Sequence, residues 1–328
     1  MTDSTAAIEA KGLSKRYGVK LAVDGLDLTV QRGEVFGFLG PNGAGKTTTL
    51  KMLLGLASPT SGQAWLLGQP VGDPTSRRRV GFLPEHFRFQ EWMTALEFLD
   101  LHGRLHRVPR STRRERIPEL LELVGLTRAS GQRLATFSKG MLQRIGLAQA
   151  LINAPEVVFL DEPTSGLDPL GRRMVRGVIA RLREQGTTVF LNSHLLSEVE
   201  VTCTRVAFIT GGRVRHIARL DDYEANLLQV VLRVGQVDDR LVEGLGRWSD
   251  IIQHEADGRT LTFNLTGQAT LPEVARWVVG QGYDLYSLSS RPRSLEDLFV
   301  DIVGEDMTAE VPGATEQLTT AHSEGTRS

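Results

Sequence analysis

The sequence predicts an α/β fold built on a parallel sheet, and three short, largely apolar runs support that prediction. They span residues 35–39, 157–160 and 188–191. Such runs, bounded by turn residues, are typical of strands that are buried on both faces of a parallel sheet. The first leads into a glycine-rich loop, the second into two carboxylates and the third into Asn-Ser-His. Because ligands bind beyond the carboxyl ends of such strands, we expect these polar groups to share one site.

The glycine-rich loop has the spacing of a phosphate-binding loop. Residues 40–48 read GPNGAGKTT and match G-x-x-x-x-G-K-[ST] between a strand and a helical pattern, the context that this motif requires. Its glycines permit positive φ and let a phosphate approach the backbone N–H groups. The residues expected to hold a nucleotide are Gly40, Asn42, Gly43, Gly45, Lys46, Thr47 and Thr48. A turn that only joins strand to helix is the alternative, and the motifs below disfavour it.

Charged groups in and opposite this loop indicate phosphate and metal binding. Lys46 is expected to contact the β- and γ-phosphates, and the Thr47 hydroxyl to bind Mg²⁺. Asp161 and Glu162 follow the strand at 157–160. Burying two carboxylates without a cation costs several kcal/mol, so we expect Mg²⁺ there, with a structural ion pair as the alternative. His194 ends the strand at 188–191 on the same edge, where a purely structural histidine is the commoner case.

A second candidate anion site lies at the start of a later helix. Ser138 is placed as the N-cap of a helical pattern that reaches Leu151, and Gly140 in the first turn leaves backbone N–H groups uncovered. A helix start of this kind can bind an anion, although most capped helices bind nothing.

The remaining segments complete the predicted organisation. Residues 8–30 alternate like antiparallel strands, and Tyr17 among them is either a base-stacking ring or a packed surface tyrosine. Residues 86–150 predict a helical insertion whose arginines between 104 and 116 form a solvated face or, alternatively, contact anionic lipid. Residues 221–304 follow the order β-α-β-β-α-β of a small ferredoxin-like α+β domain without nucleotide motifs. The tail at 305–328 is poor in large apolar residues and is predicted to be disordered.

Composition limits the classes of protein that remain. The 328 residues are 41% hydrophobic, which is enough for one large and one small domain. A net charge of −1 gives no general reason to expect a nucleic-acid partner. Cys203 is the only cysteine, which excludes an intramolecular disulfide and favours a reducing cytosol. Residues 1–10 lack the apolar core of a signal peptide, and no apolar run is long enough to span a bilayer.

Taken together, these motifs resemble the ATP-binding subunit of ABC transporters over residues 8 to about 220. The resemblance implies a P-loop NTPase of ABC type, with a RecA-like parallel core, an antiparallel β-subdomain and a helical subdomain at about 86–150. It also implies roles for seven further positions. Tyr17 stacks on the base, Asp161 holds Mg²⁺, Glu162 is the catalytic glutamate and His194 is the switch histidine. Ser138 and Gly140 belong to the signature motif at 138–144, and Asp168 belongs to the D-loop at 165–168.

Three short stretches are similar to the ABC-2 type subgroup, which handles drugs, lipids, polysaccharides or small ions. They are residues 138–141, 83–85 and the ending at 294–299. Two positions depart from the general family. Lys139 replaces a glycine of the signature, which the subgroup tolerates, and Glu85 replaces a glutamine that contacts Mg²⁺. A hard cation accepts either oxygen, so Glu85 is still expected to contact the metal.

The resemblance implies a dimer that encloses two ATP molecules with Mg²⁺, each between the phosphate loop of one chain and the signature of the other. The second chain is a further copy or a paralogous ATP-binding subunit. Separate polytopic permease subunits, docked near Glu85 and the helices after it, would place the chain in the cytoplasm on the inner face of the membrane. The alternative is a soluble ABC ATPase of translation, DNA repair or chromosome maintenance. A simple P-loop kinase is a third possibility, in which residues 138–144 and His194 would have no place.

Overall fold

The computed structural model describes residues 6–220, 227–249, 252–267, 270–292 and 294–300. Its largest sheet has the strand order β10-β9-β3-β8-β7-β6. The strands are β3 (Val35–Leu39), β6 (Val80–Leu83), β7 (Val157–Asp161), β8 (Thr188–Asn192), β9 (Arg205–Thr210) and β10 (Arg213–Arg219). Strands β9, β3, β8, β7 and β6 are parallel, and β10 pairs antiparallel with β9 at the edge. The predicted parallel core is confirmed.

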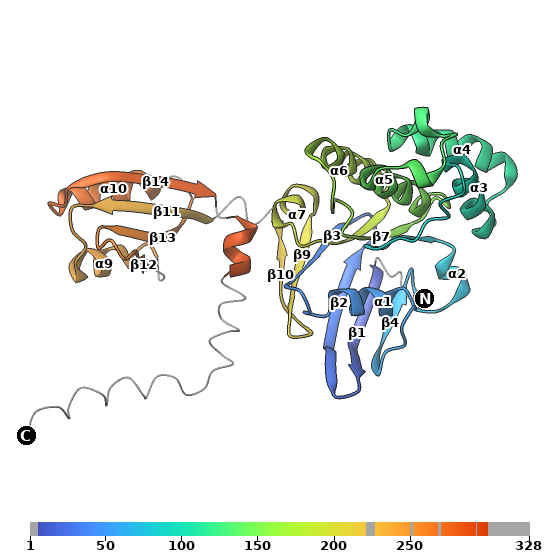
Figure 1. Ribbon diagram of the computed structural model, residues 1–328. Coiled ribbons are helices and arrows are strands. Elements are labelled where there is room, and N and C mark those ends of the chain that lie inside the picture. The colour runs from blue at the N-terminus through green and yellow to red at the C-terminus, as the bar shows by residue number, and fades with distance from the viewer. Residues whose placement is uncertain (1–5, 221–226, 250–251, 268–269, 293, 301–328) are drawn as a thin grey trace, which may run out of the picture.

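An antiparallel sheet covers one face of this core (Figure 1). It consists of β1 (Ala6–Tyr17), β2 (Lys20–Gln31), β4 (Ser61–Leu66) and β5 (Gln69–Pro70), in the order β2-β1-β4-β5. Helix α1 (Lys46–Leu53) packs between the two sheets. Their shared core includes Phe36 and Phe38 of β3 and Leu50 of α1, all at most 1% exposed. This layer fixes the position of the phosphate loop, which joins β3 to α1.

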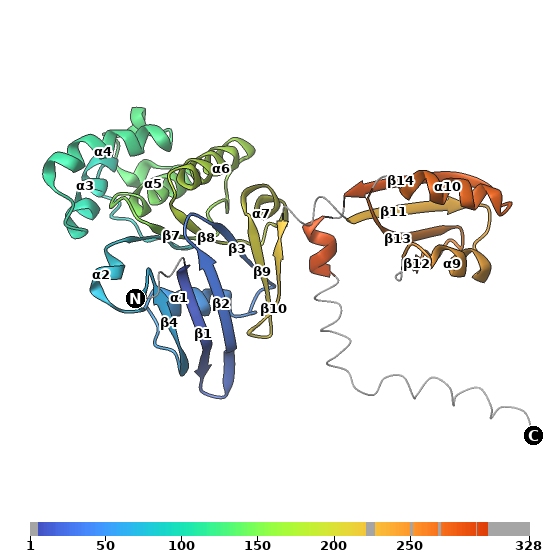
Figure 2. The ribbon, with the colours of Figure 1, turned by 180° about the vertical axis from the view of Figure 1, so that it is seen from behind.

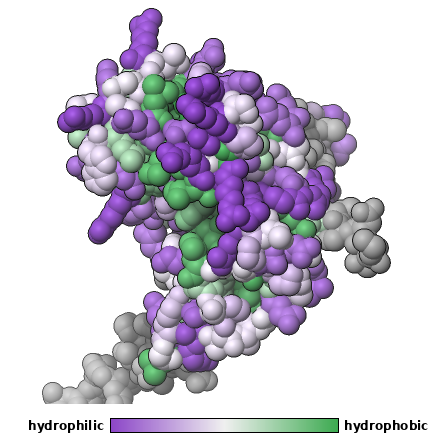
Figure 3. Space-filling model, turned by 90° about the vertical axis from the view of Figure 1, so that its right-hand side faces the viewer, coloured by the Kyte–Doolittle hydropathy of each residue, from purple (hydrophilic) through white to green (hydrophobic). Residues whose placement is uncertain are grey.

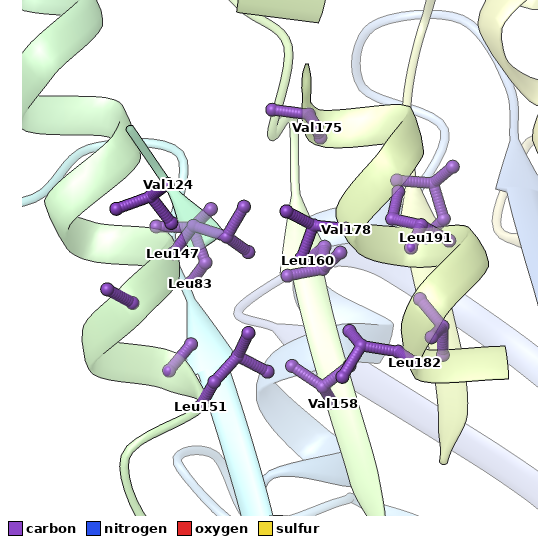
Figure 4. Packing of buried hydrophobic residues seen from close by; sticks show 14 of the residues in the cluster. Leu83, Val124, Leu147, Leu151, Val158, Leu160, Val175, Val178, Leu182 and Leu191 are labelled. Atoms are coloured by element: carbon purple, nitrogen blue, oxygen red, sulfur yellow. The ribbon is translucent and has the colours of Figure 1, made fainter. Parts of the chain in front are cut away.

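Helices cover the opposite face of the large sheet. Helix α5 (Lys139–Ala150) and α6 (Pro169–Glu184) lie directly on it, and α7 (Leu196–Thr202) lies nearer β3. Figure 4 shows Leu147 of α5 beside Leu83 of β6 and Val178 of α6 beside Leu160 of β7, all in one buried cluster. The helical subdomain adds α3 (Ala95–Leu105), α4 (Arg110–Leu123) and the short 3₁₀ helices η1 (Thr127–Ala129) and η2 (Leu134–Thr136), while α2 (Pro74–Arg77) precedes β6. None of the helices among the described residues is long and apolar enough to cross a bilayer.

The C-terminal part forms a sheet with its own core. Its elements are β11 (Leu227–Val234), α9 (Asp239–Leu245), β12 (Ile252–His254), β13 (Thr260–Thr266), α10 (Leu271–Gly280) and β14 (Leu285–Pro292). The strand order β12-β13-β11-β14, antiparallel throughout, is that of the predicted ferredoxin-like fold (Figure 2). Val230, Phe263 and Val278 lie in its core and are at most 2% exposed.

A helical segment at 295–300, which follows the small sheet, packs against the first domain. Leu295 and Leu298 belong to the same buried cluster as α5 and α6. The Leu295 N–H donates to Oε1 of Glu200 at 3.0 Å, and the Phe299 ring lies 6.2 Å from that of Phe208. The division of the chain at 220 and 304 remains a prediction, and the tail at 305–328 lies outside the described residues.

Candidate functional site

A cleft of about 650 Å³ opens at the carboxyl edge of the large sheet. It is lined by Tyr17, by every residue of the loop 40–48 except Ala44, and by Glu85, Glu162 and His194. Eleven of the sequence-predicted site residues therefore line one cleft, although they come from five separate segments of the chain. Asp161 does not line it but lies behind it, where its Oδ1 accepts a hydrogen bond from Nδ2 of Asn192 at 2.5 Å.

The phosphate loop is held so tightly that two of its glycines have no room for a side chain. A Cβ at Gly40 would lie 2.1 Å from the carbonyl oxygen of Ile209, and one at Gly45 would lie 2.4 Å from that of Ala22. Gly45 also has φ 106°, a left-handed conformation that residues with a Cβ rarely adopt. It is the N-cap of α1 and makes no side-chain cap bond, so the first N–H groups of this helix remain available to an anion.

Lys46 lies inside this loop rather than in solvent. Its Nζ donates to the carbonyl oxygens of Gly40 at 2.7 Å and Pro41 at 3.1 Å. Burial lowers the pKa of the Lys46 ammonium, while the charges of Glu162, Asp161 and Glu85 act in the opposite direction. The side chain thus brings a positive charge to the centre of the cleft.

The carboxylates opposite Lys46 carry more negative charge than one lysine balances. Asp161 and Glu162 are 3% and 6% exposed, and burial raises the pKa of each carboxyl. The charge of Glu85 adds to the rise at Asp161. In the described part of the chain, no group of three or more His, Cys, Asp or Glu side chains could hold a metal by itself. These donors fit a hard cation such as Mg²⁺ that takes its remaining ligands from phosphate and water.

Glu162 has a strained backbone that several hydrogen bonds hold in place. Its φ is 51°, which is uncommon for a residue other than glycine. Its N–H donates to the carbonyl oxygen of Asn192 at 2.9 Å, and its own carbonyl oxygen accepts from the Ser165 N–H at 3.1 Å. The carboxylate Oε2 lies 2.7 Å from Nδ1 of His194. The strain therefore points the carboxylate into the cleft beside His194.

Ser138, Gly140 and Asp168 do not line the cleft of their own chain. Ser138 caps α5 as predicted, since its Oγ accepts from the Met141 N–H at 3.2 Å. The Asp168 carboxylate caps α6 by accepting from the Gly171 N–H at 2.7 Å. Within one chain, the signature motif and the D-loop are thus apart from the phosphate loop.

Four cleft residues outside the phosphate loop are absent from the sequence prediction. Lys20 and Ala22 come from β2, Asn192 ends β8, and Phe299 comes from the segment 295–300. Asn192 could have been found by the reasoning that selected His194, because both follow the same buried strand. Phe299 belongs to the ending at 294–299 that resembles the ABC-2 type subgroup, but the sequence does not indicate that it reaches the cleft, because it does so only through the docking of its segment.

The fold and the cleft define a class, the P-loop nucleotide hydrolases, with a loop for phosphates facing buried carboxylates across the edge of a parallel sheet. The family described as ABC transporter matches residues 23–165. An uncharacterized ABC transporter ATP-binding protein of Nostoc sp. is 44% identical over 291 residues, which cover 88% of this chain and 85% of that protein. The chain therefore belongs to the ABC transporter ATP-binding proteins, and it is an ATPase.

Two further relatives extend the comparison. The Nod factor export ATP-binding protein I of Cupriavidus metallidurans is 35% identical over 307 residues, which cover 92% of this chain and 99% of that protein. A solved structure of a dimeric ATP-binding cassette in a post-hydrolysis state, bound to ADP and Pi, superimposes with a TM-score of 0.61 at 26% identity. It covers 65% of this chain and 98% of that one. The predicted ABC-type fold and the family are confirmed.

The raised pKa of Glu162 predicts how stability depends on pH. A carboxyl with a raised folded-state pKa contributes stability that is present below its unfolded pKa of 4.5 and is lost as pH rises through the folded value. Glu162→Gln cannot lose a proton, so the nucleotide-free variant should melt above the unsubstituted protein at pH 8. In a domain of this size, each kcal/mol corresponds to about 2 to 4 °C.

The measurement is the melting temperature of both proteins between pH 8 and pH 5, where the difference should shrink as pH falls. Glu122→Gln, on the exposed side of α4, is the matched control and should follow the unsubstituted protein at every pH. An equal or lower melting temperature of Glu162→Gln at pH 8 would contradict the conclusion that burial of the ionised Glu162 carboxylate destabilises the folded chain.

Proposed function

We propose that this chain is the ATP-hydrolysing subunit of an ABC-2 type transporter, working as a dimer around two ATP molecules and driving separate permease subunits. The proposal rests on one observation: within a single chain, the phosphate loop and the signature motif do not share a cleft. The loop 40–48 faces Glu162 and His194 across one cleft, whereas Ser138 and Gly140 lie outside that cleft. A second chain, either another copy or a paralogue, would bring the missing signature to the nucleotide.

Each group around the cleft has a role in this proposal. Lys46, Thr48 and the free N–H groups of α1 bind the phosphates, and Tyr17, which is 49% exposed, stacks on the base. Thr47, Asp161 and Glu85 are the residues that would hold Mg²⁺. The ion, when bound, would neutralise charge on the phosphates.

Glu162 is proposed as the group that polarises the attacking water. A general base works best when its pKa lies near the operating pH, and burial raises the pKa of this carboxyl toward that range. His194, whose Nδ1 lies 2.7 Å from the Glu162 carboxylate, is proposed to contact the γ-phosphate and to keep the carboxylate oriented.

A permease is proposed to dock on the side of the helical subdomain. The side chains of Trp92 and Leu96 are 70% and 41% exposed. Phe87 and Phe89, which follow Glu85 in the sequence, are half-buried. Figure 3 shows this side of the molecule, where hydrophobic residues form a band between hydrophilic ones. Exposed apolar groups of this kind are typical of protein interfaces. The chain would then act on the cytoplasmic face of a membrane, and the relative that exports Nod factor supports export.

The small domain is proposed to be an accessory unit that regulates or stabilises the dimer. None of its described residues before Ser294 lines the cleft, and it is continuous with the segment that places Phe299 there. Residues 1–220 would form the ATPase domain and 221–304 the accessory domain. A soluble ABC ATPase of translation, DNA repair or chromosome maintenance is the competing function, and the co-purification experiment below separates it from the transporter subunit.

The dimer is tested by combining two variants of the cleft. Glu162→Gln keeps the shape of the side chain but removes most of its basicity, and a positioned base contributes about 10²- to 10⁴-fold in rate. Bound ATP should therefore persist and hold two chains together. Size-exclusion chromatography with Mg-ATP should give a dimer peak for Glu162→Gln and none for Lys46→Ala, which lacks its phosphate anchor.

If the isolated chain needs its permease to dimerise, the same comparison is made on the complex. Hydrolysis by Glu162→Gln at close to the unsubstituted rate would remove Glu162 from its proposed role and leave His194 as the first candidate to orient the water.

The docking surface is tested by placing a charge on it. Trp92→Glu should abolish co-purification with the membrane permease, because a buried unpaired carboxylate at the interface is costly. ATP binding by the isolated variant should be unchanged. Val279→Glu, at a side chain 57% exposed on the small domain, is the control and should keep the permease. Recovery of ribosomes or DNA in place of any membrane protein would support the soluble alternative.

A further inference from the structure

The signature helix is joined to the catalytic glutamate within the same chain through Gln143. This residue lies on α5, five positions after the N-cap Ser138. Its Nε2 donates to the carbonyl oxygen of Pro163 at 3.2 Å and to that of Glu162 at 3.4 Å. One side chain of α5 therefore donates to the carbonyl oxygens of two successive peptide units, the first of which begins at Glu162.

Two packing contacts reinforce this junction. A Cβ at Gly166 would lie 2.6 Å from Cε and 2.8 Å from Nζ of Lys139, so the lysine lies directly across the D-loop glycine. A Cβ at Gly140 would lie 3.4 Å from Cδ2 of Leu167. The first turn of α5 thus rests on residues 166–167, and Gln143 continues the contact to Glu162.

The geometry of Glu162 makes it sensitive to such a contact. Its left-handed backbone is maintained only because its neighbours hold it, and Gln143 supplies one of the hydrogen bonds to its carbonyl oxygen. A small rotation of α5 would move the Gln143 amide and, with it, the Glu162 carbonyl group that accepts its hydrogen bond. The backbone of Glu162 would turn, and its carboxylate would point in another direction. The direction of the Glu162 side chain is therefore linked to the position of the signature helix.

We propose that Gln143 is a positioning residue that couples the two ATP sites of the dimer. The inference rests on the proposed function, in which Ser138 and Gly140 of a chain hold the ATP of the partner. Glu162 of the same chain serves the ATP on its own phosphate loop. ATP bound by the partner would fix α5, and α5, through Gln143, would fix Glu162 for hydrolysis at the other site. Each site then reaches full activity only when both are occupied.

The test removes the donor while keeping the shape of the side chain. Gln143→Met should lower kcat by about 10- to 100-fold, the effect expected when a reacting group is misplaced by about 1 Å. The ATP concentration that gives half-maximal rate should change little, because the residue does not touch nucleotide. The Hill coefficient for ATP should fall from above one toward one, because coupling between the sites is lost.

Two further variants separate positioning from general damage. Gln143→Lys restores a donor on a flexible stem and should recover most of kcat and of the Hill coefficient. Gln149→Met is the same change on the same helix, about 9 Å further along its axis, and should behave as the unsubstituted protein. All rates are measured on the full-length chain, or on its permease complex if the chain alone is monomeric.

The outcomes distinguish this inference from the proposed function. An unsubstituted protein that hydrolyses ATP and dimerises, but has a Hill coefficient of one, would overturn the coupling alone. Unchanged kinetics of Gln143→Met would overturn it as well, as would equal losses in Gln143→Met, Gln143→Lys and Gln149→Met, which indicate a structural role. Absence of the Mg-ATP dimer of Glu162→Gln, both in the isolated chain and in the permease complex, would instead overturn the proposed function.

Discussion

The organisation of this protein depends on an imbalance of charge at one edge of its parallel sheet. Asp161 and Glu162 lie at the end of a fully buried strand, and the Lys46 ammonium is a positive charge close enough to interact with both. Burial raises the pKa of both carboxyls, which is the expected result when charged groups lose water without full compensation. In the proposed function, a divalent cation bound with the nucleotide would supply the compensation, so its binding would also relieve an unfavourable feature of the empty site.

The fold makes this arrangement possible by fixing the backbone around it. The parallel strands bring the ends of β3, β7 and β8 to one edge, and layers on both faces exclude water from all three. Within that frame, the glycines at 40 and 45 allow the phosphate loop to lie against neighbouring carbonyl oxygens. The strained Glu162 is tolerated because the surrounding strands and α5 hold it by hydrogen bonds. The packed layers thus stabilise the strained backbone conformation of Glu162.

The sequence alone predicts those features that depend on which residues directly follow a strand or helix. The phosphate loop, Glu162 and His194 each follow a buried strand, so their meeting at one edge could be predicted. The ferredoxin-like order of the small domain was visible for the same reason, from alternating strand and helix patterns. Gln143 and Phe299 could not be found this way. Their contacts depend on the tilt of α5 and on the return of the segment 295–300, which only tertiary packing determines.

The central claim is that each ATP site is completed by the signature motif of a second chain. It is tested most directly by mixing two inactive variants, Lys46→Ala and Ser138→Asp. The aspartate preserves the helix cap but repels phosphate. A mixed dimer contains one site with an intact Lys46 from one chain and an intact Ser138 from the other. The account predicts ATPase activity in the mixture that neither variant has alone, but below that of the unsubstituted dimer because the second site stays empty. Activity in the mixture no greater than the sum of the two separate variants would contradict it.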